Sequence, residues 1–248
     1  MYDFDIGKWV VKLMDTSHSY FTLLKFVNDK DAFSSHTDNL RIYTTSSDDN
    51  ELIIQKDSIH KEYFTSEMKK NIEQAVESYS NQMLVILATY IETINLEFFE
   101  TLFTKNNQLI FDYTTNNDEH NGYIKLNLLF DSNSKDEIIQ KLILTSKNNA
   151  VNGSLKRVSE RIFKLTKYQI SKKLIDSIQS EIFDKRNSIV HESENHMIKK
   201  ENIESYFQLT EKYLFELGKA CKKIGAPYLD QANWLEKPNK NEETNSLP

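Results

Sequence analysis

Proline is confined to the end of this chain. Its three prolines, Pro227, Pro238 and Pro248, lie in the last 22 residues, so the first 226 residues contain none. Proline interrupts a helix because it lacks a backbone N–H and its ring clashes with the preceding turn. The proline-free part also contains only five glycines. Long helices are therefore the structure that this sequence favours.

The clearest helix is predicted from about Ser66 to Phe103. Apolar side chains recur there at steps of three or four residues, which places them on one side of a helix. They are Met68, Ile72, Val76, Tyr79, Met83, Ile86, Tyr90, Ile94, Phe98 and Leu102. A helix with such a stripe must be buried against other helices.

Further helices follow in the second half of the chain. A capping box, Ser134-Lys-Asp-Glu137, opens one that is predicted to end near Lys147, before a turn at 148–153. Another helical stretch begins at Ser154, with a break predicted near Tyr168.

The last long helix is predicted from roughly Lys200 to Lys223. Its inward positions are Ile203, Phe207, Tyr213, Leu217 and Cys221. After Gly225 the composition turns to Pro, Asn and charge, so we expect a frayed tail from about Glu236.

Two segments depart from the helical pattern. Residues 40–45 and 51–55 flank a turn-like sequence, and residues 108–113 and 123–130 flank another at 116–122. Both pairs are predicted as small β-hairpins. The predicted fold class is thus mainly α, an up-and-down helical bundle with one or two hairpin decorations. Residues 1–62 form an N-terminal extension, 63–224 the helical domain and 225–248 a tail.

Composition restricts the compartment and the partners. The single cysteine, Cys221, excludes an intrachain disulfide and indicates a reducing compartment. Neither a signal peptide nor a membrane span is predicted, because the longest nearly continuous apolar run is Met83 to Ile91. We therefore expect a cytoplasmic protein without membrane contact.

Charge is distributed unevenly along the chain. The formal net charge is −6, but residues 151–190 contain nine Lys or Arg and four Asp or Glu, a local balance of +5. A polyanion such as RNA is therefore expected to bind this segment, although a solvated helix face is the simpler interpretation of the charge alone.

Three polar residues interrupt the apolar pattern after Tyr168. Apolar residues recur there in two neighbouring rows at multiples of four: Ile170, Leu174, Ile178 and Ile182, and Ile175 and Phe183. The first row continues to Arg186, and the second continues through Asn187 to His191. The pattern predicts all three on a core-facing surface, where polar groups are costly unless they are paired or reach a cleft.

These side chains suit phosphate chemistry. The planar guanidinium of Arg186 matches a pair of phosphoryl oxygens, and only four of the 31 basic residues are arginines. Histidine side chains titrate near neutral pH as a class. A histidine at position 191 can therefore take a proton from a ribose 2′-hydroxyl or give one to the leaving 5′-oxygen. Together they suffice for RNA transesterification without a metal or cofactor.

The residues Arg186-Asn-Ser-Ile-Val-His191 resemble the Arg-(polar)-x3-His signature of the HEPN superfamily, which closes the third helix of a four- or five-helix bundle. The order of elements is also similar over about residues 63–224: a long first helix with Tyr90-Ile-Glu92 and Phe98-Phe99, two helices, the motif and a final helix. Residues 1–62 are not covered by the resemblance.

The resemblance implies an HEPN-like bundle that dimerises, so that two motifs face one composite cleft. It also implies a metal-independent ribonuclease of toxin–antitoxin or phage-defence systems, with an inhibitory or antitoxin protein as a further partner. Arg186 would stabilise the transition state, His191 would be the acid/base and Asn187 would orient them. Ser193 stands where related toxins often carry a tyrosine.

Other residues are interpreted in two ways. Glu92 either pairs with Arg186 or is an ordinary exposed glutamate; Glu92, Glu192 and Ser193 are assigned as supporting residues. His191 and His196 are five residues apart and do not share a helix face, so no metal site is predicted. Cys221 is interpreted as a small core residue.

The leading hypothesis is a homodimeric, metal-independent endoribonuclease that leaves 2′,3′-cyclic phosphate ends. A dimer is expected because one chain offers a single histidine within the motif, whereas transesterification moves two protons. The alternative is an HEPN-like module that binds a nucleotide or a partner protein without chemistry. A purely structural helical interaction protein is the third interpretation, and it leaves the polar trio unexplained.

Overall fold

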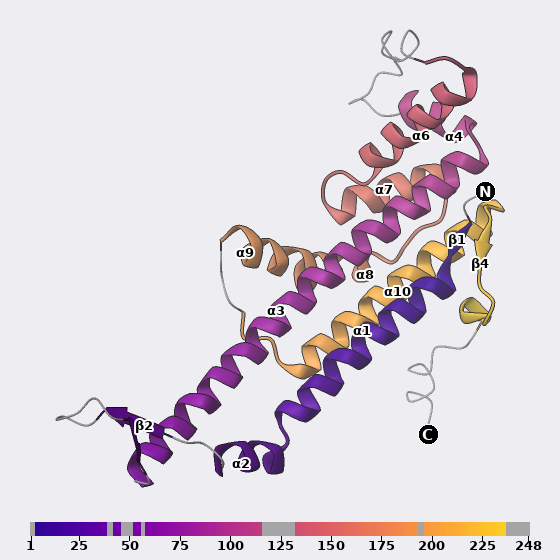
Figure 1. Ribbon diagram of the computed structural model, residues 1–248. Coiled ribbons are helices and arrows are strands. Elements are labelled where there is room, and N and C mark those ends of the chain that lie inside the picture. The colour runs from indigo at the N-terminus through magenta and orange to yellow at the C-terminus, as the bar shows by residue number, and fades with distance from the viewer. Residues whose placement is uncertain are drawn as a thin grey trace, which may run out of the picture.

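The structure is a computed structural model that describes residues 3–38, 42–45, 52–55, 58–115, 132–192 and 196–236. It is mainly helical, as predicted (Figure 1). The helices are α1 (Ile6–Val27), α2 (Lys30–Asp38), α3 (Ser58–Lys105), α4 (Gln108–Thr115), α6 (Lys135–Ala150), α7 (Leu155–Thr166), α8 (Lys172–Ile178), the π-helical η1 (Gln179–Asp184), α9 (Lys185–His191), α10 (Lys200–Ile224) and the 3₁₀ turn η2 (Trp234–Glu236). The strands are β1 (Phe4–Asp5), β2 (Ile42–Thr45), β3 (Leu52–Gln55) and β4 (Tyr228–Leu229).

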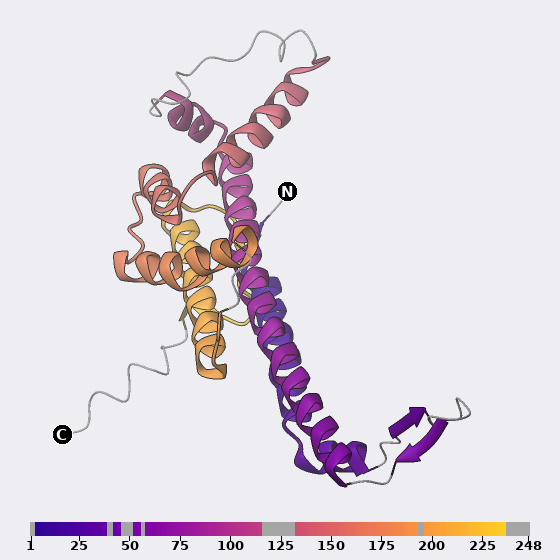
Figure 2. The same cartoon turned by 90° about the vertical axis from the view of Figure 1, so that its left-hand side faces the viewer.

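The long helix α3 is the axis of the molecule. It runs beside α1 and α10, with β2 and β3 beyond one of its ends and α4 and α6 near the other (Figures 1 and 2). Of the predicted stripe, Met83, Ile94, Phe98 and Leu102 are buried, while no described residue from 62 to 79 is. The buried surface widens to the neighbouring Leu84, Leu87, Ala88 and Ile91 because several helices cover the second half of α3.

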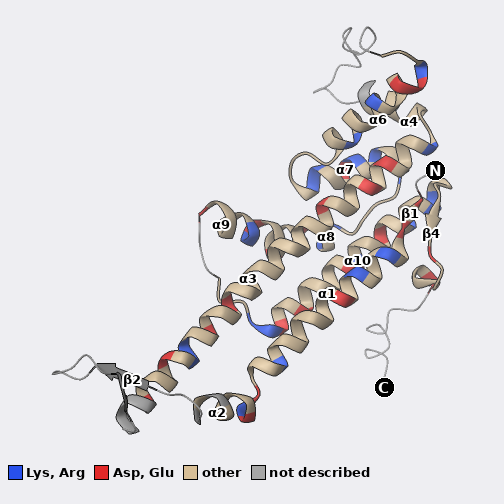
Figure 3. Cartoon of the chain, viewed as in Figure 1, with Lys and Arg blue, Asp and Glu red and all other residues tan. Residues whose placement is uncertain are grey.

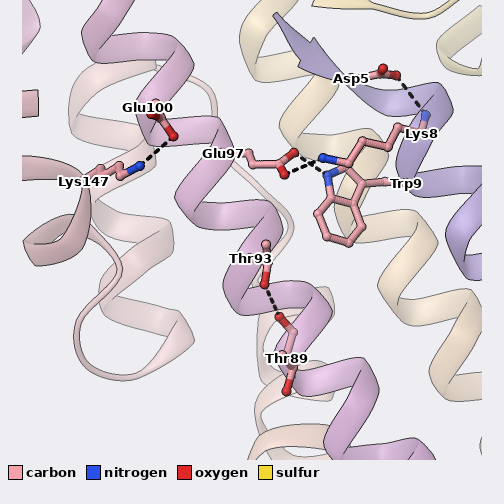
Figure 4. A network of polar contacts seen from close by, with 8 residues as sticks. All are labelled: Asp5, Lys8, Trp9, Thr89, Thr93, Glu97, Glu100 and Lys147. Carbon is pink, nitrogen blue, oxygen red and sulfur yellow. Dashed lines mark hydrogen bonds and ion pairs between the residues drawn. The ribbon is translucent and has the colours of Figure 1, made fainter. Parts of the chain in front are cut away.

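The N-terminal helix belongs to this same core. Trp9 of α1 is 1% exposed, and its indole N–H donates to Oε2 of Glu97 on α3 at 2.7 Å. Lys8 makes a 2.6 Å ion pair with the other oxygen of Glu97 (Figure 4). The predicted N-terminal extension therefore contributes a helix that packs directly on the long helix of the predicted domain.

The two ends of the fold meet in a small parallel sheet. Phe4 pairs with Tyr228 and Asp5 with Leu229. Asp5 also caps α1, since its side chain accepts the Lys8 N–H at 2.9 Å. The start of α1 is thereby fixed beside the end of α10.

The first predicted hairpin is confirmed and the second is wrong in its first strand. β2 and β3 pair antiparallel, from Ile42 with Gln55 to Thr45 with Leu52. Residues 108–113 lie instead in helix α4, which buries Ile110 and Tyr113 three residues apart. The Asn106 side chain accepts the Gln108 N–H at 3.0 Å, a local bond that favours a turn into the helix. The second strand, 123–130, lies outside the described residues.

The predicted helix boundaries after residue 132 are largely confirmed. The Glu137 N–H donates to Oγ of Ser134 at 3.1 Å, and Oε2 of Glu137 accepts the Asn133 N–H at 2.8 Å. α6 runs on to Ala150, slightly past the predicted end. The break near Tyr168 is present, because α7 ends at Thr166.

The last helix agrees with its prediction. α10 ends at Ile224 and is capped by Gly225, whose φ of +64° is the left-handed conformation that glycine adopts readily. All five of its predicted inward residues are buried. The predicted tail, 237–248, lies outside the described residues.

One described helix, the 62–105 part of α3, is long and apolar enough to cross a membrane. Half of its apolar window is buried inside the protein, as in the core helix of a soluble protein. The structure is therefore consistent with a soluble protein.

Candidate functional site

The helix that carries the motif contains a π-helical segment. α8 passes into η1 and η1 into α9 without interruption. In a π-helix the hydrogen bonds join residues five apart, and such wider turns occur frequently at functional sites. Ile178 and Ile182 are fully buried, but no residue of α9 is. The apolar row therefore ends just before Arg186.

The three motif residues do not share a core-facing surface, so this part of the prediction was wrong. Arg186 is half-buried, whereas Asn187 and His191 are exposed. On an α-helix, residues four apart are rotated by about 40° from one another around the helix axis, so a row at this spacing gradually turns away from the core. Arg186 and His191 are five apart, which rotates them by about 140°. The π turn changes the register further. Arg186 and His191 thus leave α9 on different sides.

Arg186 is held by two oxygen acceptors. Its Nη2 donates to Oε1 of Glu92 on α3 at 3.2 Å, and its Nη1 donates to Oδ1 of Asn187 at 3.1 Å. The pairing with Glu92 that the sequence suggested is therefore present. Because the Arg186 and Glu92 side chains are 23% and 45% exposed, solvent screening limits this pair to about 1 kcal/mol or less.

One donor of Arg186 is not used. Its Nε is buried and has no hydrogen-bond partner in the described part of the chain. A buried donor without a partner is costly and calls for an explanation. The guanidinium is held in one plane by two acceptors and its side chain is 23% exposed, so an oxygen of a phosphate can reach it from the solvent side.

His191 lies in the last turn of α9 and is exposed to solvent. It makes no hydrogen bond or ion pair with any residue in the described ranges. Glu192, which follows it, is also exposed. Ser193 lies outside the described residues. The imidazole is therefore accessible to a substrate, and Glu192 is not one of the two acceptors that hold Arg186.

A second histidine lies beside the motif, and sequence reasoning missed it. The His196 Nε2 is hydrogen-bonded to Oγ of Ser188, the third residue of the motif. The His196 backbone is held by Asn81 of α3: its N–H donates to Oδ1 at 3.1 Å, and its carbonyl accepts from Nδ2 at 3.0 Å. Helix spacing does not predict this contact, because His196 lies outside a helix.

A lysine network lies beside Arg186. The Lys185 Nζ donates to Oε2 of Glu181 at 2.5 Å and to the Tyr206 hydroxyl at 2.9 Å, which ties the start of α9 to α10. Burial lowers the pKa of Lys185, but these two partners outweigh it and leave the pKa above its ordinary value. Lys185 therefore stays positively charged and is held toward α10, whereas Arg186, the next residue, pairs with α3.

The basic segment contains both surface and internal cations. Lys156, Lys164, Lys172 and Lys173 are exposed on or next to α7 and α8, and Figure 3 shows basic residues on α7 and α9. Arg161 is internal: its Nη1 donates to the carbonyls of Ala150, at 3.2 Å, and Asn152. Binding of a polyanion to this segment stays a prediction that involves the exposed lysines.

Neither a reactive cysteine nor a metal-binding group is found among the described residues. Cys221 is fully buried, and burial raises the pKa of its thiol to about 12. Within the described ranges, no group of three or more His, Cys, Asp or Glu side chains is arranged to hold a metal ion.

Comparison with known proteins adds no relative: no family model, curated protein or solved structure matches the chain.

Proposed function

We propose that this chain is a metal-independent endoribonuclease of the HEPN type that acts in the cytoplasm in bacterial defence or growth arrest. The observation that carries the proposal is Arg186, whose guanidinium is fixed by Glu92 and Asn187 and stays partly exposed to solvent. The accessible His191 lies further along the same helix. The position of this helix between α3 and the final α10 supports an HEPN-like bundle.

The proposed reaction is transesterification within the RNA strand. The ribose 2′-oxygen bonds to phosphorus as the P–O5′ bond breaks, which leaves a 2′,3′-cyclic phosphate and a 5′-hydroxyl. Arg186 stabilises the charge that develops on the phosphoryl oxygens. One proton leaves the attacking hydroxyl and another reaches the departing oxygen, and His191 serves one of these transfers.

A second copy of the chain is the proposed partner at the motif. Val190 is 50% exposed and Met197 is 85% exposed, so apolar side chains lie close in sequence to both histidines. Apolar groups beside a polar site are typical of an interaction surface. In a twofold dimer the same patch of each chain meets its counterpart, which would bring the two motifs together around bound RNA. An inhibitory or antitoxin protein would cover the same surface.

A second candidate is an HEPN-like module that binds a nucleotide or a partner protein without chemistry. The observation that favours it is the position of Arg186 and His191 on different sides of α9. In such a module His191 would not have to act on the phosphate that Arg186 holds.

Expression in bacteria separates the two candidates. We expect the wild-type chain to arrest growth and degrade cellular RNA, and His191→Ala to do neither at equal expression. His18→Ala is the matched control, since His18 is an exposed histidine on α1. Arrest by His191→Ala with RNA left intact would favour the binding module over the ribonuclease.

A further inference from the structure

The side of α7 that faces the solvent is basic. On an α-helix each residue is rotated by about 100° from the one before it, so five residues of α7 fall within an arc of about 120°. We call this arc the basic face, and all of its residues are exposed: Lys156, Arg157, Glu160, Phe163 and Lys164. The opposite side of α7 is buried in the core.

The cations of the basic face are not paired with acids. Residues 151–180 contain seven Lys or Arg and two Asp or Glu, yet within the described ranges none of them takes part in an ion pair. Basic positions on α7 are visible in Figure 3. Past the end of α7, Lys167 is exposed and its carbonyl accepts from the exposed Lys223 of α10. These positive charges are therefore available to a polyanion, although the net charge of the chain is −6.

An aromatic ring lies among these cations. Phe163 is 41% exposed, and no other ring or cation contacts its ring in the part of the chain that the structure describes. Lys156 precedes it by about two helical turns and Lys167 follows it by about one, so cations lie on both sides of the ring along the helix axis. Proteins that bind single-stranded nucleic acid combine these two elements, because bases stack on aromatic rings while cations bind the phosphates.

A single strand fits the basic face better than a membrane or a duplex. A helix that binds a membrane inserts its apolar side into the lipid, but the apolar side of α7 is buried in the core. In a duplex the bases are stacked on one another, so no base face is open to Phe163. An unpaired strand offers both the phosphates and the open bases that the face can bind.

We propose that the basic face of α7 binds single-stranded RNA, with one base stacked on Phe163 and the adjoining phosphates bound by the lysines and by Arg157. The inference rests on the proposed function for its choice of RNA, and it names the form of RNA that the ribonuclease takes as substrate. α7 packs against α8, which continues through η1 into the helix of Arg186. The basic face binds the substrate and takes no part in its cleavage.

Binding to an RNA that cannot be cleaved tests the inference apart from the chemistry. A short 2′-O-methyl RNA strand lacks the 2′-hydroxyl that transesterification needs, so the full-length wild-type protein can bind it without cutting it. Its affinity is measured by fluorescence anisotropy at several salt concentrations. Two further probes are the same strand in a duplex and poly-glutamate, a polyanion that has no bases.

Removal of the ring should affect only the single strand. Phe163→Leu keeps an apolar side chain without a ring, and we expect it to weaken binding of the strand by about 5–150-fold, the contribution of one stacked base. It should change neither the salt dependence nor the binding of the duplex and of poly-glutamate. Phe163→Tyr keeps a ring and should bind the strand like the wild type.

Removal of the charges should instead change the salt dependence. Lys156→Ala combined with Lys164→Ala should reduce the slope of log K against log salt by about 1.4, because each phosphate contact on a single strand contributes about 0.7. Glu160→Lys should tighten binding, since it replaces the one acid of the basic face. All these positions are exposed, so the variants should melt like the wild type.

Matched controls come from other exposed helix positions. Phe26→Leu removes a ring that is 68% exposed on α1, and Lys69→Ala combined with Lys70→Ala removes two exposed cations of α3. We expect none of these substitutions to change the affinity for the strand.

Several results would overturn the inference separately from the proposed function. An affinity of Phe163→Leu for the strand equal to that of the wild type would show that no base stacks on this ring. Poly-glutamate bound as tightly as the RNA strand would identify a surface for acidic proteins. An unchanged salt slope in the double lysine variant would place the phosphates elsewhere. A wild-type chain that binds the strand as expected but leaves cleavable RNA intact would instead refute the ribonuclease and leave the binding face in place.

Discussion

Arg186→Ala separates a catalytic from a structural role of the guanidinium. The substitution removes a partly exposed ion pair with Glu92, worth about 0.2–1 kcal/mol, and a bond to the neighbouring Asn187. It also removes the buried Nε–H, whose lack of a partner costs about 1–3 kcal/mol. The two effects oppose one another, so we expect the free energy of unfolding to fall by no more than about 1 kcal/mol or to rise. For a chain of this size that is a decrease in melting temperature of about 4 °C at most.

Arg161→Ala is the matched control, because this arginine has the opposite environment. It is 9% exposed, and its guanidinium donates to two backbone carbonyls in the turn between α6 and α7. A hydrogen bond from a charged donor contributes about 1.5–3 kcal/mol. We therefore expect a loss of at least about 3 kcal/mol, which is a decrease in melting temperature of about 6–12 °C.

The assay is thermal unfolding of both variants together with RNA cleavage below their melting temperatures. We expect Arg186→Ala to lose about 10²–10³-fold in cleavage rate, as when one donor to a transition-state oxyanion is removed. Arg161→Ala should keep its rate while folded. A melting temperature lowered as far in Arg186→Ala as in Arg161→Ala, with cleavage unaffected, would refute the reasoning.

Two further predictions concern the core and its cysteine. Tyr213→Phe should destabilise the protein by about 1–3 kcal/mol, because the buried hydroxyl donates to Asn95 at 2.7 Å and its loss leaves a buried acceptor without a partner. Urea unfolding measures this loss. An equal loss in Tyr63→Phe, at an exposed tyrosine, would contradict the prediction. Burial raises the pKa of the Cys221 thiol to about 12, so the thiol should stay protonated and should not react with iodoacetamide at pH 7 or pH 9. Alkylation of the native protein that increases from pH 7 to pH 9 would show that the thiol is accessible.

The helices were predictable because their signals are local. Absence of proline, the stripe on α3, the Ser134 cap and the end of α10 at Gly225 all depend on residues close in sequence. Helix α4 was missed because a short apolar run is compatible with either a strand or a helix, and burial of Ile110 and Tyr113 decides between them.

The site was predictable only in part. The pairing of Arg186 with Glu92 followed from the need to pair a half-buried cation with an anion. The exposure of Asn187 and His191 did not follow, because the π turn at η1 has no recognisable sequence pattern and changes the register before the motif. The contact of Asn81 with His196 was also not predictable, since it joins residues 115 positions apart.

End analysis of RNA cleaved in EDTA tests the central claim most directly. Purified wild-type protein is incubated with a defined RNA oligonucleotide, and the fragments are analysed by mass spectrometry beside those from His191→Ala. We expect 2′,3′-cyclic phosphate and 5′-hydroxyl ends from the wild type and intact RNA with the variant, because Arg186 and His191 act without a metal. Cleavage that appears only when Mg²⁺ is added, or equal cleavage by His191→Ala, would contradict the account.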